Sequence, residues 1–380
     1  MNDPMAWSDA TQVVRGGDEP VVPGTPLRPS PVFAAPYHLG EDPLAADFYA
    51  RPGHPTLRVL ERAIGDLDRG DCLVFATGMA AISAAVLSVV GAGDRVVIPS
   101  DGYYQTRALG AADLSRFGVV VEQVPTLEIA DVAARGDLEG AAFVLLETPS
   151  NPELDVCDIA AVAAATRAAG AVLAVDNTTA TPLGQRPLEL GADLTLAADT
   201  KALTGHSDLL MGHVSTARTE RGRELYTRLK GWRDRTGNGP GAFDAWLAHR
   251  SLSTLDLRLA RQAQTAAAVA ELLADHPAAT GVRWPGRVGD PSYAIAARQM
   301  RRMNGVVSAT LADEAAVHAL VRHSRLWLAA TSFGGVHSSV DRRAQWGGDA
   351  VPAGFVRFSC GIEDTDDLVA DLGAALDAVT

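Results

Sequence analysis

Short apolar runs and helical stretches alternate along most of the chain, and this alternation constrains the fold more than any other feature. Six runs have the length and composition of buried strands: Leu73–Phe75, Arg95–Ile98, Val119–Gln123, Phe143–Leu146, Val172–Val175 and Leu194–Ala197. Helical patterns lie between them at Ala80–Val90, Gln105–Phe117, Ile129–Arg135 and Ile159–Ala169. Strands that alternate with helices usually pair in parallel. We therefore predict an α/β fold with a mostly parallel sheet that helices cover on both faces.

The segments outside this alternation predict two further parts of the molecule. The first ~45 residues are rich in Pro, Gly and acidic groups and predict an extended arm that packs on a partner subunit. Leu57 to Leu67 recur at helical spacing. A charged helical segment is predicted at Thr219–Lys230 and a long helix at Phe243–Leu273. Strands at Val306–Leu311 and Phe355–Ser359 then predict a smaller α+β C-terminal domain. We place the boundaries at 1–48 for the arm, 49–245 for the large domain and 246–380 for the C-terminal domain.

Charge and cysteine usage exclude several functional classes. The 380 residues include 33 Lys and Arg against 46 Asp and Glu, a formal charge of −13, whereas nucleic-acid-binding surfaces are basic. Three cysteines without C-x-x-C spacing indicate neither a disulfide framework nor a metal site. Residues 1–20 lack a signal pattern, and Thr77-Gly78 interrupts the apolar stretch 72–93. We expect a cytoplasmic protein that binds neither nucleic acid nor membrane.

Candidate site residues follow the predicted strands, because ligands of open α/β sheets bind beyond the carboxyl ends of the strands. Asp176 follows one strand, and Lys201 follows the next as one of only two lysines in the chain. Thr77-Gly78-Met79 opens a helix, whose free N–H groups suit a phosphate. Pyridoxal 5′-phosphate needs a Schiff-base lysine, an acid that keeps its pyridine nitrogen protonated, and a phosphate site. These residues therefore predict a pyridoxal-phosphate site.

Other interpretations fit the pattern less well. Lys230, the second lysine, lies in a charged helical stretch where we expect salt bridges. Considered alone, Lys201 is equally consistent with a surface lysine at a strand end. A nicotinamide-dependent enzyme is disfavoured because no G-x-G-x-x-G follows the first strand. The chain also lacks the P-loop, G-x-S-x-G and H-E-x-x-H motifs, and its nine histidines show no ligand-like pairing.

The motifs around these residues resemble the Cys/Met-metabolism (transsulfuration) family of pyridoxal-phosphate enzymes. The most specific motif runs from Asp199-Thr200-Lys201 through Gly205-His206-Ser207-Asp208 to Met211-Gly212. Further matches are Tyr49 to Thr56, Thr77-Gly78-Met79, Glu147-Thr148-Pro149 with Asn151-Pro152, Val175 to Thr178, and Arg357-Phe358-Ser359 with Gly361 to Asp364. The likeness covers nearly the whole chain after the arm. It implies an aspartate-aminotransferase-type large domain (fold type I) beside a smaller C-terminal domain.

The resemblance implies a role for each matched residue. Lys201 would bind the cofactor and move protons, and Tyr103 would stack on its ring and protonate the leaving group. Asp176 would pair with the pyridine nitrogen, and Asn151 would lie beside the phenolic oxygen. Gly78, Met79 and Thr200 would contact the phosphate, and Tyr49 and Arg51 would reach it from a neighbouring subunit. Arg357 would bind the substrate carboxylate. Thr331 and Ser332 would line the same pocket. A homodimer or homotetramer with shared active sites follows.

Three positions depart from the family pattern. Ala198 stands where a serine is usual, which removes one hydroxyl contact to the phosphate, and Asp199 is an unusual neighbour of the Thr-Lys pair. His54 replaces a usual asparagine. These departures bear on cofactor affinity and not on the lysine chemistry.

Within the family, the substrate is decided by a few positions. Phe48 before Tyr49 and the 231–237 segment are similar to methionine γ-lyases, whereas Gln105 stands where those enzymes have a pocket cysteine. Thr331 replaces a glutamate that could meet the second amino group of cystathionine. We predict γ-elimination of L-methionine to 2-oxobutanoate, ammonia and methanethiol. The alternatives are a cystathionine γ-lyase or γ-synthase, and a catalytically idle interaction protein on the same fold.

Overall fold

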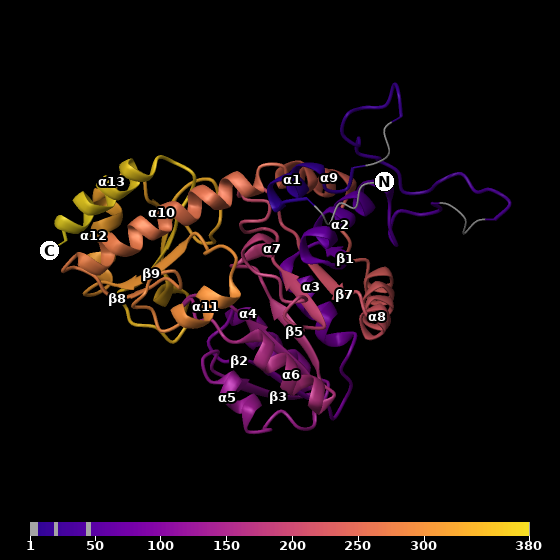
Figure 1. Cartoon of the computed structure of the whole chain (residues 1–380), viewed down its shortest axis with the longest axis horizontal. Coiled ribbons are helices and arrows are strands. Elements are labelled where there is room, and N and C mark those ends of the chain that lie inside the picture. The colour runs from indigo at the N-terminus through magenta and orange to yellow at the C-terminus, as the bar shows by residue number, and fades with distance from the viewer. Residues whose placement is uncertain (1–6, 19–21, 43–46, 380) are drawn as a thin grey trace.

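The computed structural model describes residues 7–18, 22–42 and 47–379. Two β-sheets organise this part of the chain, one of seven strands and one of five (Figure 1). In the described ranges we find no helix whose length and hydropathy would allow it to cross a bilayer.

The larger sheet confirms the predicted α/β architecture. Its strands are β1 (Gly70–Phe75), β2 (Arg95–Pro99), β3 (Val120–Val124), β4 (Ala141–Glu147), β5 (Val172–Asp176), β6 (Leu194–Ala197) and β7 (Gly212–Ala217), in the order β1-β7-β6-β5-β4-β2-β3. Strands β2 to β6 pair in parallel, and β7 is antiparallel to both of its neighbours. The six predicted strands are present. The pattern did not predict β7, because its glycine, histidine, serine and threonine residues give no apolar run.

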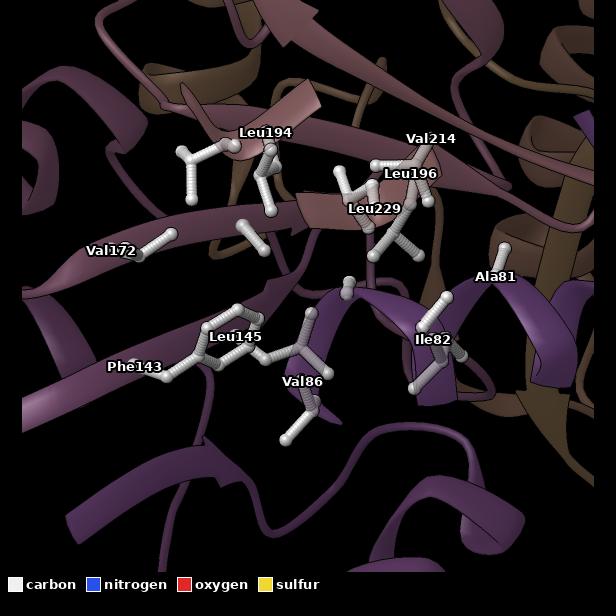
Figure 2. Packing of buried hydrophobic residues seen from close by; sticks show 14 of the residues in the cluster. Ala81, Ile82, Val86, Phe143, Leu145, Val172, Leu194, Leu196, Val214 and Leu229 are labelled. Atoms are coloured by element: carbon white, nitrogen blue, oxygen red, sulfur yellow. The ribbon is translucent and has the colours of Figure 1, made fainter. Parts of the chain in front are cut away.

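Helices cover both faces of this sheet (Figure 1). They are α2 (Pro55–Asp68), α3 (Gly78–Leu87), α4 (Tyr104–Ala108) with a π-helical continuation at Leu109–Leu114, α5 (Ile129–Ala134), α6 (Ile159–Ala169), α7 (Thr181–Gly184) and α8 (Glu220–Thr236). Figure 2 shows how Ala81, Ile82 and Val86 of α3 pack on apolar side chains of the sheet. The residues on the sheet side of this core include Phe143, Leu145, Leu194, Leu196 and Val214. Burial of these side chains fixes α3 and therefore the loop that precedes it.

The smaller sheet follows in the chain. Its strands are β8 (Thr280–Arg283), β9 (Val306–Thr310), β10 (Leu328–Ala329), β11 (Ser339–Arg342) and β12 (Phe355–Ser359), in the order β10-β11-β12-β9-β8. The helical elements of this part are α11 (Tyr293–Gln299), α12 (Glu314–His323), the 3₁₀ segment Arg343–Trp346 and α13 (Thr365–Asp377). The strands predicted near Val306 and Phe355 are both present, while the exact domain boundaries given above remain a prediction.

One predicted helix is wrong. The segment Phe243–Leu273 forms two helices, α9 (Ala242–Leu252) and the long α10 (Leu255–Asp275), which extends toward the smaller sheet (Figure 1). The buried Arg258 donates to Ser251 O at 3.1 Å and to the Thr254 hydroxyl at 3.1 Å. This guanidinium satisfies a carbonyl at the end of α9 that a continuous helix would have paired internally. Because apolar residues continue through the break, periodicity alone does not reveal it.

The N-terminal arm is only partly extended. A short helix, α1 (Asp9–Arg15), lies within it and was not predicted. Residues 22–42 form loops that project from the body of the molecule, with Leu27, Phe33 and Leu39 exposed (Figure 1). The rest of the predicted arm, at 1–6, 19–21 and 43–46, lies outside the described residues.

Candidate active site

A cavity of about 420 Å³ lies at the carboxyl ends of the central strands. Strands β4, β5 and β6 end beside it, and residues that follow β10 and lie on β12 close it from the smaller sheet. The predicted site residues that line it are Gly78, Met79, Tyr103, Asn151, Asp176, Thr200, Lys201, Thr331, Ser332 and Arg357. Positions far apart in the sequence therefore meet in one pocket. The strand-end argument predicted this for the residues around Gly78, Asp176 and Lys201, and the family resemblance implied it for the others.

The start of α3 forms a cradle for an anion. Thr77 caps the helix, because its hydroxyl accepts the N–H of Ala80 at 3.0 Å. The N–H groups of the helix that precede Ala80 have no carbonyl partner within the helix. Gly78 is required here, because a Cβ at this position would lie 2.5 Å from Ala198 Cβ. Thr200 also lines the cavity, and its hydroxyl exchanges hydrogen bonds with the backbone of Met211 at 3.0 and 3.2 Å. The cradle suits a phosphate group.

Asp176 is the last residue of β5 and lies on the floor of the pocket. Its Oδ1 accepts the N–H of Thr178 at 2.9 Å and the Thr178 hydroxyl at 2.5 Å. Burial raises the pKa of Asp176, and the two bonds from Thr178 act in the opposite direction. One oxygen, Oδ2, takes no part in these bonds. A protonated ring nitrogen could donate to this oxygen.

Lys201 projects from the turn that follows β6. Its Nζ donates to the Ser332 hydroxyl at 2.7 Å and lies 5.3 Å from the centre of the Phe333 ring. Burial, together with the neighbouring guanidinium groups of Arg357 and Arg343, lowers the pKa of Lys201 to about 8. The turn itself is anchored, since Arg258 donates to Ala202 O at 2.7 Å and to Leu203 O at 3.0 Å. A nucleophilic amine is thus held on a rigid support.

Tyr103 lines the same pocket and directly precedes α4. Its ring meets the Tyr104 ring edge-on, with 5.0 Å between centroids. Burial raises the pKa of the Tyr103 hydroxyl, so this group is protonated at neutral pH and can donate a proton.

Arg357 lies on β12 and its guanidinium is almost completely buried. It donates to Asn151 Oδ1, to Ser332 O at 2.7 Å and to Asp341 Oδ2 at 3.1 Å. Its Nε has no partner in the described part of the chain. Ser332 has a left-handed backbone, with φ of 76°, which directs its carbonyl toward Arg357 and its hydroxyl toward Lys201. An arginine held in this way with a free donor suits a carboxylate ligand.

Tyr49 and Arg51 are the two predicted site residues that the structure places outside the pocket. Tyr49 is 44% exposed, and the Arg51 guanidinium lies 5.8 Å from the centre of its ring. Arg51 also donates to the carbonyl oxygen of Asp234 on α8. Their contact with the cofactor of a neighbouring subunit remains a prediction.

The structure adds pocket residues that the sequence did not single out. Glu147 lies beside Asp176, and Arg343 and Trp346 approach from the 3₁₀ segment after β11. Arg343 pairs with Asp341 at 2.8 Å and with Asp349 at 2.6 Å. Glu147 belongs to the Glu147-Thr148-Pro149 motif, which could have identified it as a site residue. No motif distinguishes Arg343, because it is one of many arginines in a chain with only two lysines.

Two sequence departures acquire an explanation. His54, in place of asparagine, caps α2: its Nδ1 accepts the N–H of Leu57 at 3.2 Å. Asp199 pairs with the buried His213 of β7, with Oδ1 and Nδ1 2.6 Å apart. Lys230 forms the predicted salt bridge, 2.7 Å from Asp234.

The lysine, the aspartate and the helix N-terminus fit the aldehyde, the pyridine nitrogen and the phosphate of one cofactor. On a mostly parallel α/β sheet, they define a pyridoxal-phosphate-dependent enzyme of fold type I. The chain belongs to the Cys/Met metabolism PLP-dependent enzyme family, whose model matches residues 32–377.

Known proteins similar to this chain have several activities. A Streptomyces coelicolor protein provisionally named as a cystathionine gamma-lyase is 49% identical over 99% of this chain and 95% of its own length. The L-methionine gamma-lyase of Pseudomonas deceptionensis is 35% identical over 92% of this chain and 90% of its own. A crystal structure of cystathionine gamma synthase from Xanthomonas oryzae pv. oryzae in complex with cystathionine matches with a TM-score of 0.91 and 34% identity, covering 98% of each chain.

Proposed function

We propose that the protein catalyses γ-elimination of a sulfur amino acid and that L-methionine is its substrate, giving 2-oxobutanoate, ammonia and methanethiol. One observation carries the proposal: an amine of lowered pKa, a protonated phenol and a buried arginine line one cavity of amino-acid size. Relatives of this family act on sulfur amino acids of this kind.

Each of these groups has a task in such a reaction. Pyridoxal phosphate, when bound, supplies the electron sink that makes the Cα proton of an amino acid removable. Arg357 binds the α-carboxylate and orients the Cα–H bond toward Lys201. Lys201, as a neutral amine, takes the protons from Cα and Cβ in turn. Tyr103 donates its proton to the departing sulfur.

The apolar part of the pocket lining supports methionine. Leu210, Phe333 and Trp346 contribute apolar surface, and Thr331 is uncharged. An S-methyl group loses no hydrogen bond when it enters such a surface, whereas a second ammonium group would need an acceptor.

Cystathionine is the second candidate, and two observations favour it. A relative of 49% identity has the name of a cystathionine gamma-lyase. In addition, Arg343 places a second guanidinium in the pocket, where it could meet the distal carboxylate of cystathionine.

Separate incubations of the holoenzyme with methionine, cystathionine, homocysteine and cysteine distinguish the candidates. We expect methionine to give equal amounts of 2-oxobutanoate and methanethiol, at a rate above that of cystathionine, with Lys201→Ala as the inactive control. Turnover of cystathionine without turnover of methionine would move the assignment to the second candidate. A colourless protein that turns over none of the four substrates would support the catalytically idle alternative.

We further propose a cytoplasmic homodimer, or a homotetramer made of two such dimers, whose active sites are shared between subunits. The outward position of Tyr49 and Arg51 supports shared sites, and three buried free cysteines are consistent with a reducing compartment.

A further inference from the structure

Glu147 is a buried acid in the active-site cavity to which the proposed chemistry gives no task. It is the last residue of β4, is 7% exposed and pairs in register with Asp176 on β5. Burial and the neighbouring carboxylate of Asp176 raise its pKa. Keeping a carboxyl group at this position is therefore costly. The hydrogen bonds that its two oxygens accept offset part of this cost.

Each oxygen of Glu147 accepts a different backbone N–H. Oε2 accepts from Tyr103 at 2.6 Å, and Oε1 accepts from Asn151 at 2.8 Å. The first of these segments packs tightly on the carboxylate, because a Cβ on Gly102 would lie 2.7 Å from Oε2. In the described part of the chain these bonds come from backbone groups and not from a cation. A glutamine in this place offers one acceptor oxygen instead of two.

The two N–H groups belong to the two halves of the proposed machinery. Tyr103 precedes α4 and carries the hydroxyl that would protonate the leaving group. Asn151 accepts a hydrogen bond from Arg357, the residue that would bind the substrate carboxylate. A single rigid side chain at the end of β4 therefore connects the residue that acts at the sulfur with the residue that holds the opposite end of the substrate.

We propose that Glu147 is a positioning residue that fixes the separation between Tyr103 and the Asn151–Arg357 pair. The inference rests on the proposed function, since the importance of that separation comes from the distance between the α-carboxylate and the sulfur of the substrate. Small errors in the placement of reacting groups are costly in rate.

The test uses the holoenzyme of Glu147→Gln with two readouts. The first is binding of L-norleucine, in which a CH₂ group replaces the sulfur of methionine so that no thiolate can leave, followed through the cofactor absorption band. The second is the separation of kcat and KM with methionine or cystathionine. We expect norleucine binding to weaken about tenfold and kcat to fall by a similar factor, as the loss of one hydrogen bond to a charged group predicts.

Asp101 provides the matched control. It lies in the same segment, two residues before Tyr103, and accepts the N–H and the hydroxyl of Thr126 at 3.0 and 2.8 Å. It lines a different cavity from the active site. Asp101→Asn should therefore leave norleucine binding and kcat within twofold of the wild type. Glu147→Asp keeps the charge, but its side chain is too short to accept from both Tyr103 and Asn151, so it should be impaired like Glu147→Gln. If the glutamine variant does not fold, the aspartate variant tests the positioning role in its place.

The outcomes separate this inference from the proposed function. Wild-type values for both Glu147 variants, or equal losses in Asp101→Asn, overturn the positioning role. A wild-type enzyme that binds norleucine but turns over no sulfur amino acid contradicts the proposed function instead, and the binding comparison still decides the role of Glu147.

Discussion

At the scale of single residues, the surroundings of the pocket lower the pKa of one amine, that of Lys201. Lys201 is buried beside two arginines, and the pKa of its amine falls to about 8. Lys230, on the outer face of α8, pairs with Asp234 instead. Burial and like charge both disfavour the ammonium form, so the site keeps a substantial fraction of Lys201 neutral near pH 8.

This lowered pKa predicts how the cofactor-free protein reacts with pyridoxal phosphate. Only the neutral amine attacks an aldehyde, so the rate should rise with pH and reach half of its maximum near the Lys201 pKa of about 8. The measurement is stopped-flow absorbance across a pH series, with borohydride trapping to confirm that the label is on Lys201. A midpoint near the ordinary lysine value of 10.5 would contradict the electrostatic argument.

The candidate site was largely predictable from the sequence at this scale. Asp176 and Lys201 follow neighbouring strands, and the geometry of a parallel sheet brings such residues together. Arg343 was not predictable, because its place depends on Asp341 and Asp349 of the smaller sheet region. Nothing local in the sequence indicates which of many arginines such a pair of acids will hold.

At the scale of elements, β7 carries a buried charge cluster. His213 contacts Asp199 at 2.6 Å and Asp68, the last residue of α2, at 3.0 Å. Asp68 also accepts the Ser215 hydroxyl at 2.6 Å. The cluster joins α2, β7 and the turn that carries Lys201. Polar residues of β7 such as His213 and Ser215 are the reason that the sequence did not predict this strand, because a buried strand is ordinarily recognised by its apolar side chains.

His213 predicts a pH dependence of stability. The two aspartates raise its pKa to about 10 from the ordinary 6.5, against the effect of burial. A raised pKa stabilises the fold fully below pH 6.5, and this contribution declines as the pH rises to about 10. His213→Gln should therefore lower the free energy of unfolding by roughly 3–5 kcal/mol at pH 6.

The test is urea unfolding of both proteins at several pH values. The difference between wild type and variant should shrink from pH 6 toward pH 10, because only the wild type loses a bound proton from this position. Ser324→Ala, which removes a hydroxyl that donates to Asp371 far from the cluster, serves as the control and should show a difference that does not change over this range. A constant difference for His213→Gln would show that the imidazole is neutral in the folded protein.

At the scale of the whole molecule, the sequence predicted the fold of the large sheet. Alternating strands and helices specify the large sheet, since each crossover has few possible arrangements. The break between α9 and α10 was not predicted, because it depends on Arg258, which donates to Ser251 O at the end of α9 and to two carbonyls of the Lys201 turn. Tyr49 and Arg51 lie at the surface, where sequence periodicity contains no information about a partner.

Shared active sites predict complementation between two inactive variants. If Arg51 serves the neighbouring subunit, a hybrid dimer of Arg51→Ala and Lys201→Ala contains one complete site. Random mixing of the two variants should then restore about a quarter of the wild-type rate of keto-acid release, whereas each variant alone stays low. Native mass spectrometry verifies that hybrids form. Hybrids without recovered activity would place Arg51 in its own subunit's site, whereas a fully active Arg51→Ala variant would place it outside catalysis.

The distribution of lysines has a practical consequence for handling the protein. Amine-coupling reagents that attach enzymes to beads or sensor chips react with accessible lysine side chains. Lys201 is enclosed in the pocket, which leaves Lys230, and Lys230 Nζ lies 3.3 Å from Pro52 O, next to Arg51. Side-chain coupling would therefore tether the protein at the surface proposed to meet its partner. A thiol introduced on the far face, with Lys230 replaced by arginine, is the better immobilisation route.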